Sequence, residues 1–239
     1  MSSELNGAEY IDGGRFIVEV IRSSRRKTAQ IKVESTMVSV VAPKTTPVEQ
    51  LERVIQNKRS WILQKVAAQR EAMPVNQRQF ISGESIPYLG RNYRLKVEQG
   101  PYAPPKLVHG RLHIQTPDGL DNPYLIRNAL IRWYKRNALN RLEQKTKRYS
   151  AIIGVEPTTV SVREFKSRWG SCTSKKELQY NWRIIMAPNR MCDYVVIHEL
   201  CHLIHHDHSQ KFWQHVERIM PEYAECREWL KQHAEQLQF

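Results

Sequence analysis

Hydrophobic and polar residues alternate along three short segments near the start of the chain. These segments, residues 16–21, 29–33 and 37–41, are rich in valine and isoleucine, and a Glu-Ser-Thr turn separates the last two. A period of two and a high content of β-branched residues predict β-strands. Residues 1–14 are polar and include a Gly-Gly pair, so we expect a loose lead-in there.

After residue 45 the spacing of the apolar residues becomes that of a helix. Thr46-Pro47-Val48-Glu49 has the sequence of a capping box with proline in the first turn. Leucine, valine and isoleucine then recur at helical intervals. We expect a single helix that runs to about residue 70.

Two hairpins, over residues 86–97 and 107–114, are predicted beyond this helix, because apolar runs there flank short turns that contain glycine. The Gly100-Pro101 and Pro104-Pro105 pairs between them favour a loop. Residues 15–116 are therefore expected to form a strand-rich N-terminal domain with one helix.

A long helix is predicted to begin the second half of the chain. Asp121-Asn122-Pro123 has the sequence of a helix start, and apolar residues continue at helical spacing to about Tyr149. Residues 117–239 are expected to form a second domain, which makes the chain a member of the α+β class. The further elements expected in it are strands over 159–165, 169–173 and 178–186, and helices over 189–204, 209–220 and 221–237.

The chain is basic, with 37 lysine and arginine residues against 24 acidic ones and a formal net charge of +13. A solvated helix face is one interpretation of the charge on the long helix, and a surface for nucleic acid, nucleotides or acidic proteins is the other. The only acidic residue of this expected helix is Glu143. Its basic residues are Arg127, Arg132, Lys135, Arg136, Arg141, Lys145, Lys147 and Arg148.

The start of the chain lacks the basic and apolar regions of a secretory signal. No apolar run approaches the roughly 18 residues needed to cross a bilayer. The four cysteines, Cys172, Cys192, Cys201 and Cys226, show no close pairing, so we expect reduced thiols. These features argue against secreted, disulfide-rich and membrane-spanning classes and favour a cytoplasmic protein.

The strongest chemical signal is the sequence His198-Glu199-Leu200-Cys201-His202. Two histidines four residues apart project from one face of a helix and can share a metal ion. Glu199 can reach a water on that ion and act as general base. A random chain of this length contains such a motif with a probability on the order of 1%. The motif therefore predicts the zinc site of a zincin-type hydrolase.

His208 is the best candidate for a third ligand. It lies six residues after His202, the interval found in metalloproteases with the motif HExxHxxGxxH. Position 205 is histidine here instead of glycine, however, and no Met-turn is identified. Seven of the nine histidines fall between residues 198 and 233, and this clustering favours a metal site over scattered core histidines.

Several neighbouring residues are alternatives for the third position. His205 would sit beside the ligand face on a continuous helix, and His206 and Asp207 would require unusual geometry. Asp207 can instead orient a ligand imidazole. A glutamate from the last helices, Glu222 or Glu225, is a weaker alternative.

These motifs resemble those of the YgjP-like metallopeptidases, a family distantly related to the SprT and WLM zincins. The N-terminal half is similar to the family as well, at Arg25-Arg26-Lys27, at Lys58 with Trp61-Ile62, and at Tyr88-Leu89-Gly90. In the C-terminal half the matching sequences are Arg168-Trp169-Gly170-Ser171-Cys172, Asn181-Trp182, Ala187-Pro188, residues 193–202, and His208-Ser209 followed by Phe212-Trp213.

The resemblance implies that His198, His202 and His208 bind zinc and that Glu199 is the base. It also implies a minimal zincin-like catalytic domain with a long helix, a small sheet, the HExxH helix and C-terminal helices. In zincins an edge strand beside the metal holds an extended peptide, and the segment Trp169-Gly170-Ser171-Cys172 is the candidate for that strand. The alternative is ordinary sheet packing, with a core tryptophan and an inert thiol.

The leading hypothesis is a zinc metallopeptidase that acts on peptides or proteins, with Glu199 taking the proton of the attacking water and returning it to the leaving amine. A second hypothesis keeps the metal but places the reaction at a phosphoanhydride, for example in a nucleotide. The third is a nucleic-acid-binding module whose metal is structural and has four protein ligands. An oxyanion donor is expected, but the sequence assigns no residue to it.

Overall fold

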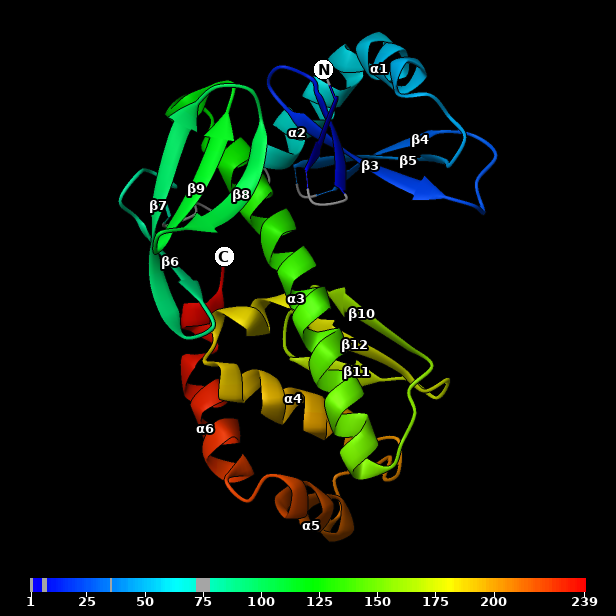
Figure 1. Cartoon of the computed structure of the whole chain (residues 1–239), viewed down its shortest axis with the longest axis vertical. Coiled ribbons are helices and arrows are strands. Elements are labelled where there is room, and N and C mark those ends of the chain that lie inside the picture. The colour runs from blue at the N-terminus through cyan, green and yellow to red at the C-terminus, as the bar shows by residue number, and fades with distance from the viewer. Residues whose placement is uncertain (1, 6–7, 35, 72–77) are drawn as a thin grey trace. The chain divides into compact units, whose positions relative to one another are not determined.

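The computed structural model describes residues 2–5, 8–34, 36–71 and 78–239. It combines helices with three small β-sheets, which confirms the expected α+β class (Figure 1). In this part of the chain, every helix is too short or too polar to span a bilayer.

The chain divides into two compact units. The first contains residues 1–85 and 94–131, and the second contains residues 86–93 and 132–239. The long helix contributes to both. The domain boundary expected at residue 116 stays a prediction, because the two units are defined by packing and not by independent folding.

A five-stranded sheet lies in the first unit. The three strands expected from the alternating pattern are confirmed, and β3 and β5 are parallel while the other neighbours are antiparallel. The expected loose lead-in is wrong over residues 2–5 and 8–12, which form two paired strands at the edge of this sheet and bury Tyr10 and Ile11. In spatial order the strands are β1 Ser2–Leu5, β2 Ala8–Asp12, β3 Ile17–Ser23, β5 Met37–Pro43 and β4 Gln30–Glu34.

Two helices, α1 Val48–Asn57 and α2 Arg59–Glu71, stand where a single helix was expected. The helix breaks at Lys58, which lies outside the ideal helical region at φ −102° and ψ 7°. The expected capping box is also wrong, because Pro47 occupies the N-cap position and no side chain caps the helix.

The core of this unit lies between the sheet and the two helices. Leu51 and Ile55 of α1 and Ile62 of α2 are fully buried against Val18 and Val40 of the sheet. Helix residues three, four and seven positions apart thus present one apolar face, and strand residues two apart supply the opposite surface.

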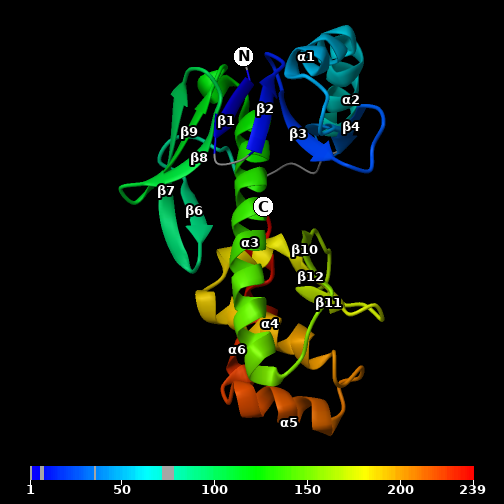
Figure 2. The ribbon, with the colours of Figure 1, turned by 45° about the vertical axis from the view of Figure 1, so that its right-hand side comes forward.

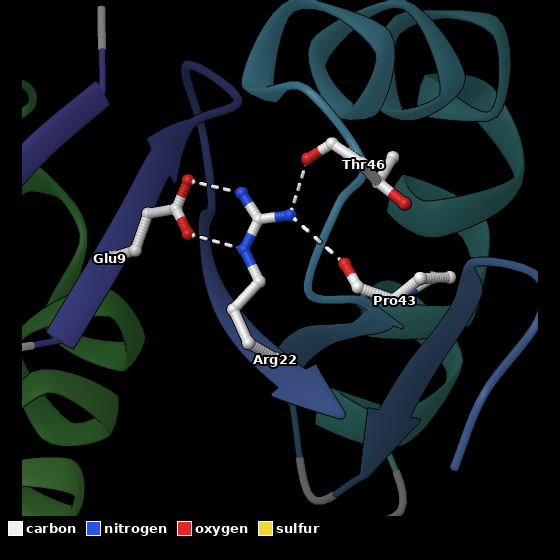
Figure 3. A network of polar contacts seen from close by, with 4 residues as sticks. All are labelled: Glu9, Arg22, Pro43 and Thr46. Atoms are coloured by element: carbon white, nitrogen blue, oxygen red, sulfur yellow. Dashed lines mark hydrogen bonds and ion pairs between the residues drawn. The ribbon is translucent and has the colours of Figure 1, made fainter. Parts of the chain in front are cut away.

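Arg22 on β3 ties three parts of the first unit together (Figure 3). Its Nε and Nη2 atoms donate to the two carboxylate oxygens of Glu9 on β2, each at 2.8 Å. Its Nη1 atom donates to the carbonyl oxygens of Thr46, at 2.5 Å, and Pro43, at 3.4 Å. A single half-buried guanidinium therefore joins β2, β3 and the segment that enters α1.

A second, four-stranded sheet confirms both expected hairpins. Leu89 and Gly90 form the first turn and His109 and Gly110 the second, and all four have the positive φ angles of tight hairpin turns. The loop expected at Pro104-Pro105 is wrong. These prolines lie in an edge strand with an irregular register, the setting in a sheet that tolerates a residue without an N–H donor. In spatial order the strands are β6 Ser85–Tyr88, β7 Arg91–Gln99, β9 Arg111–Thr116 and β8 Ala103–Val108.

The long helix α3, Pro123–Ile153, has the expected buried side, but some of its basic residues do not lie on an open surface, whereas Lys147 and Arg148 are exposed. Arg127 and Arg132 are buried, and Lys145 forms an ion pair with Asp193 at 2.5 Å. At these three positions both interpretations of the charge, a solvated face and a face open to polyanions, are therefore wrong. The apolar residues expected on the inner side are all buried, namely Ile126, Leu130, Trp133 and Leu142.

A three-stranded sheet in the second unit lies beside α3 and α4 (Figure 2). Its central strand β12 is parallel to β10 and antiparallel to β11. The hydroxyl groups of Thr146 on α3 and Tyr180 on β12 lie 3.0 Å apart, so α3 packs on one sheet face. The elements of the unit are β10 Thr159–Arg163, β11 Gly170–Cys172, β12 Glu177–Asn181, the 3₁₀ helices η2 Trp182–Met186 and η3 Glu235–Leu237, α4 Asn189–Cys201, α5 Gln210–Ile219 and α6 Tyr223–His233.

Several elements of the second unit end earlier than expected, and two of these lie beside the site. The strand expected over 178–186 stops at Asn181, whose side-chain oxygen accepts from the N–H of Arg183 and starts η2. The site helix α4 ends at Cys201, although its apolar spacing continues to Ile204. The chain then turns within a few residues, and this turn decides which histidines meet.

Candidate metal centre

Helix α4 places the first three residues of the site. His198 and Glu199 lie in its last turn, and His202 is its C-cap residue. The Nδ1 atom of His202 lies 3.0 Å from the carbonyl oxygen of His205. Because a carbonyl can only accept, this ring nitrogen is the donor, and the lone pair of Nε2 is left for a ligand.

The turn after α4 brings His208 back to the helix. One ring nitrogen from each of His198, His202 and His208 lies within 4.8 Å of the others. The Nε2 atoms of His198 and His208 are 3.1 Å apart, close enough for both to reach one ion at a metal–nitrogen distance of about 2.0–2.1 Å.

His198 is held in the form that binds a metal. Burial lowers the pKa of its imidazole to about 3, and the positive charge of His202, His208 and Arg227 acts in the same direction. The ring is therefore neutral at physiological pH, with a lone pair available. Three imidazoles are the donor set of many zinc sites, so these residues fit a zinc ion.

Two aromatic residues on α5 support the histidines. Phe212 is fully buried, and its ring lies 4.6–5.0 Å from the rings of all three, stacked on that of His202. The Trp213 ring stacks on His208, with centroids 5.6 Å apart. These rings restrict the rotation of the imidazoles and exclude water from beneath them, which favours a preorganised ligand set.

The alternatives for a third ligand lie elsewhere or have other partners. The His205 ring packs against that of His215, with centroids 5.6 Å apart. Asp207 accepts a hydrogen bond from the N–H of Ser209 at the start of α5. Glu222 and Glu225 both pair with Arg190, and His206 is exposed at the wall of the cavity.

Glu199 lies almost entirely out of solvent, with 5% of its surface exposed. Burial raises the pKa of its carboxyl group to about 8, while the charge of Arg168 acts in the opposite direction. A Cβ atom at Gly170 would lie 2.5 Å from Oε1 of Glu199. The backbone of β11 is thus the wall against which this carboxylate rests, and only glycine leaves it room.

Strand β11 carries the expected substrate segment and is an edge strand. The carbonyl of Trp169 accepts from Asn181, and the N–H of Thr173 donates to Glu177, so alternate residues of the strand face β12. Gly170 and Cys172 lie between them, and their N–H and C=O groups therefore point to the open edge.

A cavity of about 750 Å³ lies between β11 and α4. All four residues of the expected substrate segment line it, together with Glu199 and the three clustered histidines. Cys172 is half-buried, and burial raises the pKa of its thiol. The substrate-binding role of this segment and the alternative of ordinary sheet packing both remain hypotheses, and the raised pKa of Cys172 agrees with the inert thiol of the alternative.

Sequence reasoning gave no role to several residues that shape this site. Arg168 lines the cavity, Asn181 holds the loop before β11, and Phe212 lies beneath the histidines. All three residues occur in the short sequences that resemble the YgjP-like family. Their roles depend on contacts between separate elements, and spacing along one element carries no signal for such contacts.

The family of the chain follows from comparison with known proteins. The crystal structure of the metallopeptidase zymogen of abylysin from Pyrococcus abyssi is 22% identical, and the match covers 38% of this chain and 93% of that one, with a TM-score of 0.35. No curated protein matches the chain in sequence. The sequence profile of the YgjP-like metallopeptidase domain matches residues 27–233. Since this range is most of the 239 residues, the chain belongs to the YgjP-like metallopeptidase family.

Proposed function

We propose that this metallopeptidase is a zinc enzyme in which His198, His202 and His208 hold the ion and Glu199 is the general base. The observation that carries the proposal is the meeting of these three imidazoles, a buried carboxylate and an open strand edge in one cavity. Membership of the family indicates the class of reaction, peptide hydrolysis with a metal ion. The arrangement of the residues supports the roles proposed for the three histidines and Glu199.

Each of the three histidines would bind the ion through one ring nitrogen. His202 donates from Nδ1 to a carbonyl and so presents Nε2, while the Nε2 atoms of His198 and His208 face each other. When bound there, zinc would polarise the scissile carbonyl and lower the pKa of the attacking water. Imidazoles already fixed by Phe212 and Trp213 lose little entropy when they bind the ion.

Glu199 moves the proton. Its carboxylate accepts a proton from the attacking water and then delivers it to the nitrogen of the leaving amine. Gly170 allows the carboxylate to lie against the strand, and burial keeps it away from competing solvent. A pKa near the operating pH suits a group that must both accept a proton and return it.

The substrate would bind as an additional strand along β11. The outward N–H and C=O groups of Gly170 and Cys172 can pair with the main chain of an extended peptide. This pairing would place a peptide bond of the substrate in the cavity that also holds Glu199 and the histidines. Main-chain pairing binds any extended sequence, so side-chain preference must come from other residues.

A test of the proposal compares the wild-type protein with Glu199→Gln. We expect the variant to keep about one zinc per chain and to lose peptide cleavage by on the order of 10³-fold or more, because the ligands stay and the base is lost. Zinc is measured by atomic emission, and cleavage with a peptide library. Removal of zinc by a chelator should abolish cleavage in the wild type, and added zinc should restore it.

Two outcomes would reject the proposal. Full cleavage by Glu199→Gln would exclude the general-base role. Hydrolysis of nucleoside triphosphates in place of peptides, lost in the same variant, would favour the phosphoanhydride hypothesis. A cytoplasmic location remains part of the proposal, and the free state of all four cysteines is consistent with it.

A further inference from the structure

Arg168 is one of the residues that line the cavity containing Glu199. It is exposed, and it lines the same wall as Trp169 and Gly170, two residues before β11 begins. A guanidinium at this position lies next to any peptide that occupies the open edge of β11.

The loop that carries Arg168 is fixed by a buried side chain. The Nδ2 group of Asn181, a residue with 4% of its surface exposed, donates to the carbonyl oxygens of Phe165 and Arg168, at 3.0 and 3.1 Å. The N–H of Asn181 donates to the next carbonyl, that of Trp169, at 2.8 Å. Three hydrogen bonds from one residue thus hold the backbone on both sides of the guanidinium.

The Arg168 side chain is positioned as well. Its guanidinium carbon lies 5.0 Å from the centre of the Phe165 ring, a cation–π arrangement that leaves the N–H donors free at the edge of the plane. Within the described part of the chain, no acidic group forms an ion pair with it. Acidic residues at the ends of the neighbouring strands have other partners, Glu164 with Arg183 and Glu177 with Thr173.

We propose that Arg168 binds a carboxylate of the peptide substrate, and that the enzyme therefore prefers peptides with an acidic group close to the scissile bond. This inference rests on the proposed peptidase function. A fixed guanidinium with free donors matches a carboxylate in shape and charge, because two parallel N–H groups can meet its two oxygens. The carboxylate can be an aspartate or glutamate side chain or the C-terminus of a short peptide.

The charge around the site favours the same class of substrate. Lys175 and Lys176, both exposed, lie in the turn at the other end of β11. The turn that follows β11 thus adds two cations to the surface near the site, although neither lines the cavity. Such an arrangement attracts acidic peptides and disfavours basic ones.

The experiment compares matched peptides on the zinc-loaded enzyme. Blocked peptides that differ only by glutamate or glutamine are assayed at each position beside the cleaved bond, and a short peptide is assayed with a free or an amidated C-terminus. The glutamate series tests a side-chain carboxylate, and the second pair tests the C-terminal one. We expect kcat/KM to be about 10- to 100-fold higher for the better acidic form, the range of a charge-assisted hydrogen bond.

Variants of Arg168 then test whether this residue causes the preference for acidic peptides. Arg168→Gln should remove it, mainly through a higher KM for the acidic peptide, so that in this variant kcat/KM for the acidic peptide falls to about the value for the neutral peptide. Arg168→Lys should keep part of it, because the charge remains and the paired donors are lost. Lys166→Gln is the matched control, since Lys166 is an exposed cation of the same loop that does not line the cavity.

A binding measurement separates this inference from the proposed function. Calorimetry with zinc-loaded Glu199→Gln should show tighter binding of the acidic peptide, and adding Arg168→Gln should abolish the difference. Equal loss of activity on acidic and neutral peptides in Arg168→Gln, or no difference in binding, would overturn the role of Arg168. If the binding difference holds but the wild type cleaves no peptide, the proposed function fails and the carboxylate site stands.

Discussion

Glu199 and Gly170 are in close contact although they belong to different segments of the site. The glycine has an extended backbone without a positive φ angle, so it is needed here for space and not for conformation. A side chain at position 170 would overlap the Cγ, Cδ and Oε1 atoms of Glu199, all within 2.7 Å of the point that its Cβ atom would occupy. The identity of residue 170 therefore controls where the carboxylate lies.

We expect Gly170→Ala to displace Glu199 while leaving the metal ligands in place. The new methyl group forces the buried carboxylate away from the strand, and a shift of about 1 Å in a catalytic group costs on the order of 10²-fold in kcat. Steady-state kinetics on a peptide substrate measures the loss. Zinc content should stay at the wild-type level, and a variant that lost zinc, or that kept the wild-type kcat, would contradict this explanation.

At the same scale, the sequence predicted some residues of the site and not others. His198, Glu199 and His202 lie on one helix, so their relation follows from helix geometry alone. His208 depended on its interval and on family resemblance, because a turn and not a helix brings it back. Phe212 was visible only as part of a motif, since nothing in its spacing indicates that it lies under three imidazoles.

The proposed role of strand β11 in substrate binding depends on its pairing with the neighbouring strand β12. Its three residues, Gly170–Cys172, are too few to stand out by hydrophobic pattern, and pairing with β12 on one side leaves the other side open. The alternation of main-chain direction then makes Gly170 and Cys172 the residues that can pair with a substrate.

This geometry predicts a periodic response to changes in the substrate backbone. N-methylation of a peptide should lower kcat/KM by about tenfold where the lost N–H faces β11, the value of one hydrogen bond together with the added bulk of the methyl group. At the alternate positions, where the N–H faces away, the effect should be much smaller. A series of peptides methylated at successive residues checks this, and a uniform loss along the series would exclude strand pairing.

The ends of elements were the least predictable features of the fold. Apolar spacing continues past Cys201 to Ile204, yet α4 stops at Cys201 and His202 caps it. The expected strand over 178–186 ends at Asn181, because the side chain of that residue caps η2 and also holds the loop before β11. Such boundaries depend on partners in other segments, and a local pattern contains none of these partners.

At the scale of the whole molecule, the metal-site residues all belong to the second unit, and the first unit has its own core and polar network. The Arg22 network in Figure 3 joins β2, β3 and the start of α1, all within the first unit. Stability of the first unit and chemistry of the second can therefore be changed separately.

We expect Arg22→Met to lower the free energy of unfolding of the first unit by about 1–3 kcal/mol, because Glu9 and the Thr46 carbonyl lose a charged donor in a half-buried setting. Hydrogen exchange followed by mass spectrometry should show faster exchange in β2 and β3, while zinc content and exchange in α4 stay unchanged. Arg25→Met, at an exposed loop position, is the control. Loss of zinc in Arg22→Met would contradict the separation of the two units.

The sequence by itself determined the α+β class and most of the elements, and it supplied the chemistry proposed for His198-Glu199-Leu200-Cys201-His202. These features depend on periodicity and on spacing within one helix, which a linear pattern contains. Tertiary structure decided that β2 joins the first sheet, that Arg127 and Arg132 of α3 are buried, and that Gly170 and Arg168 line the cavity with Glu199. Those outcomes depend on contacts between distant segments, and such contacts form only when the chain packs.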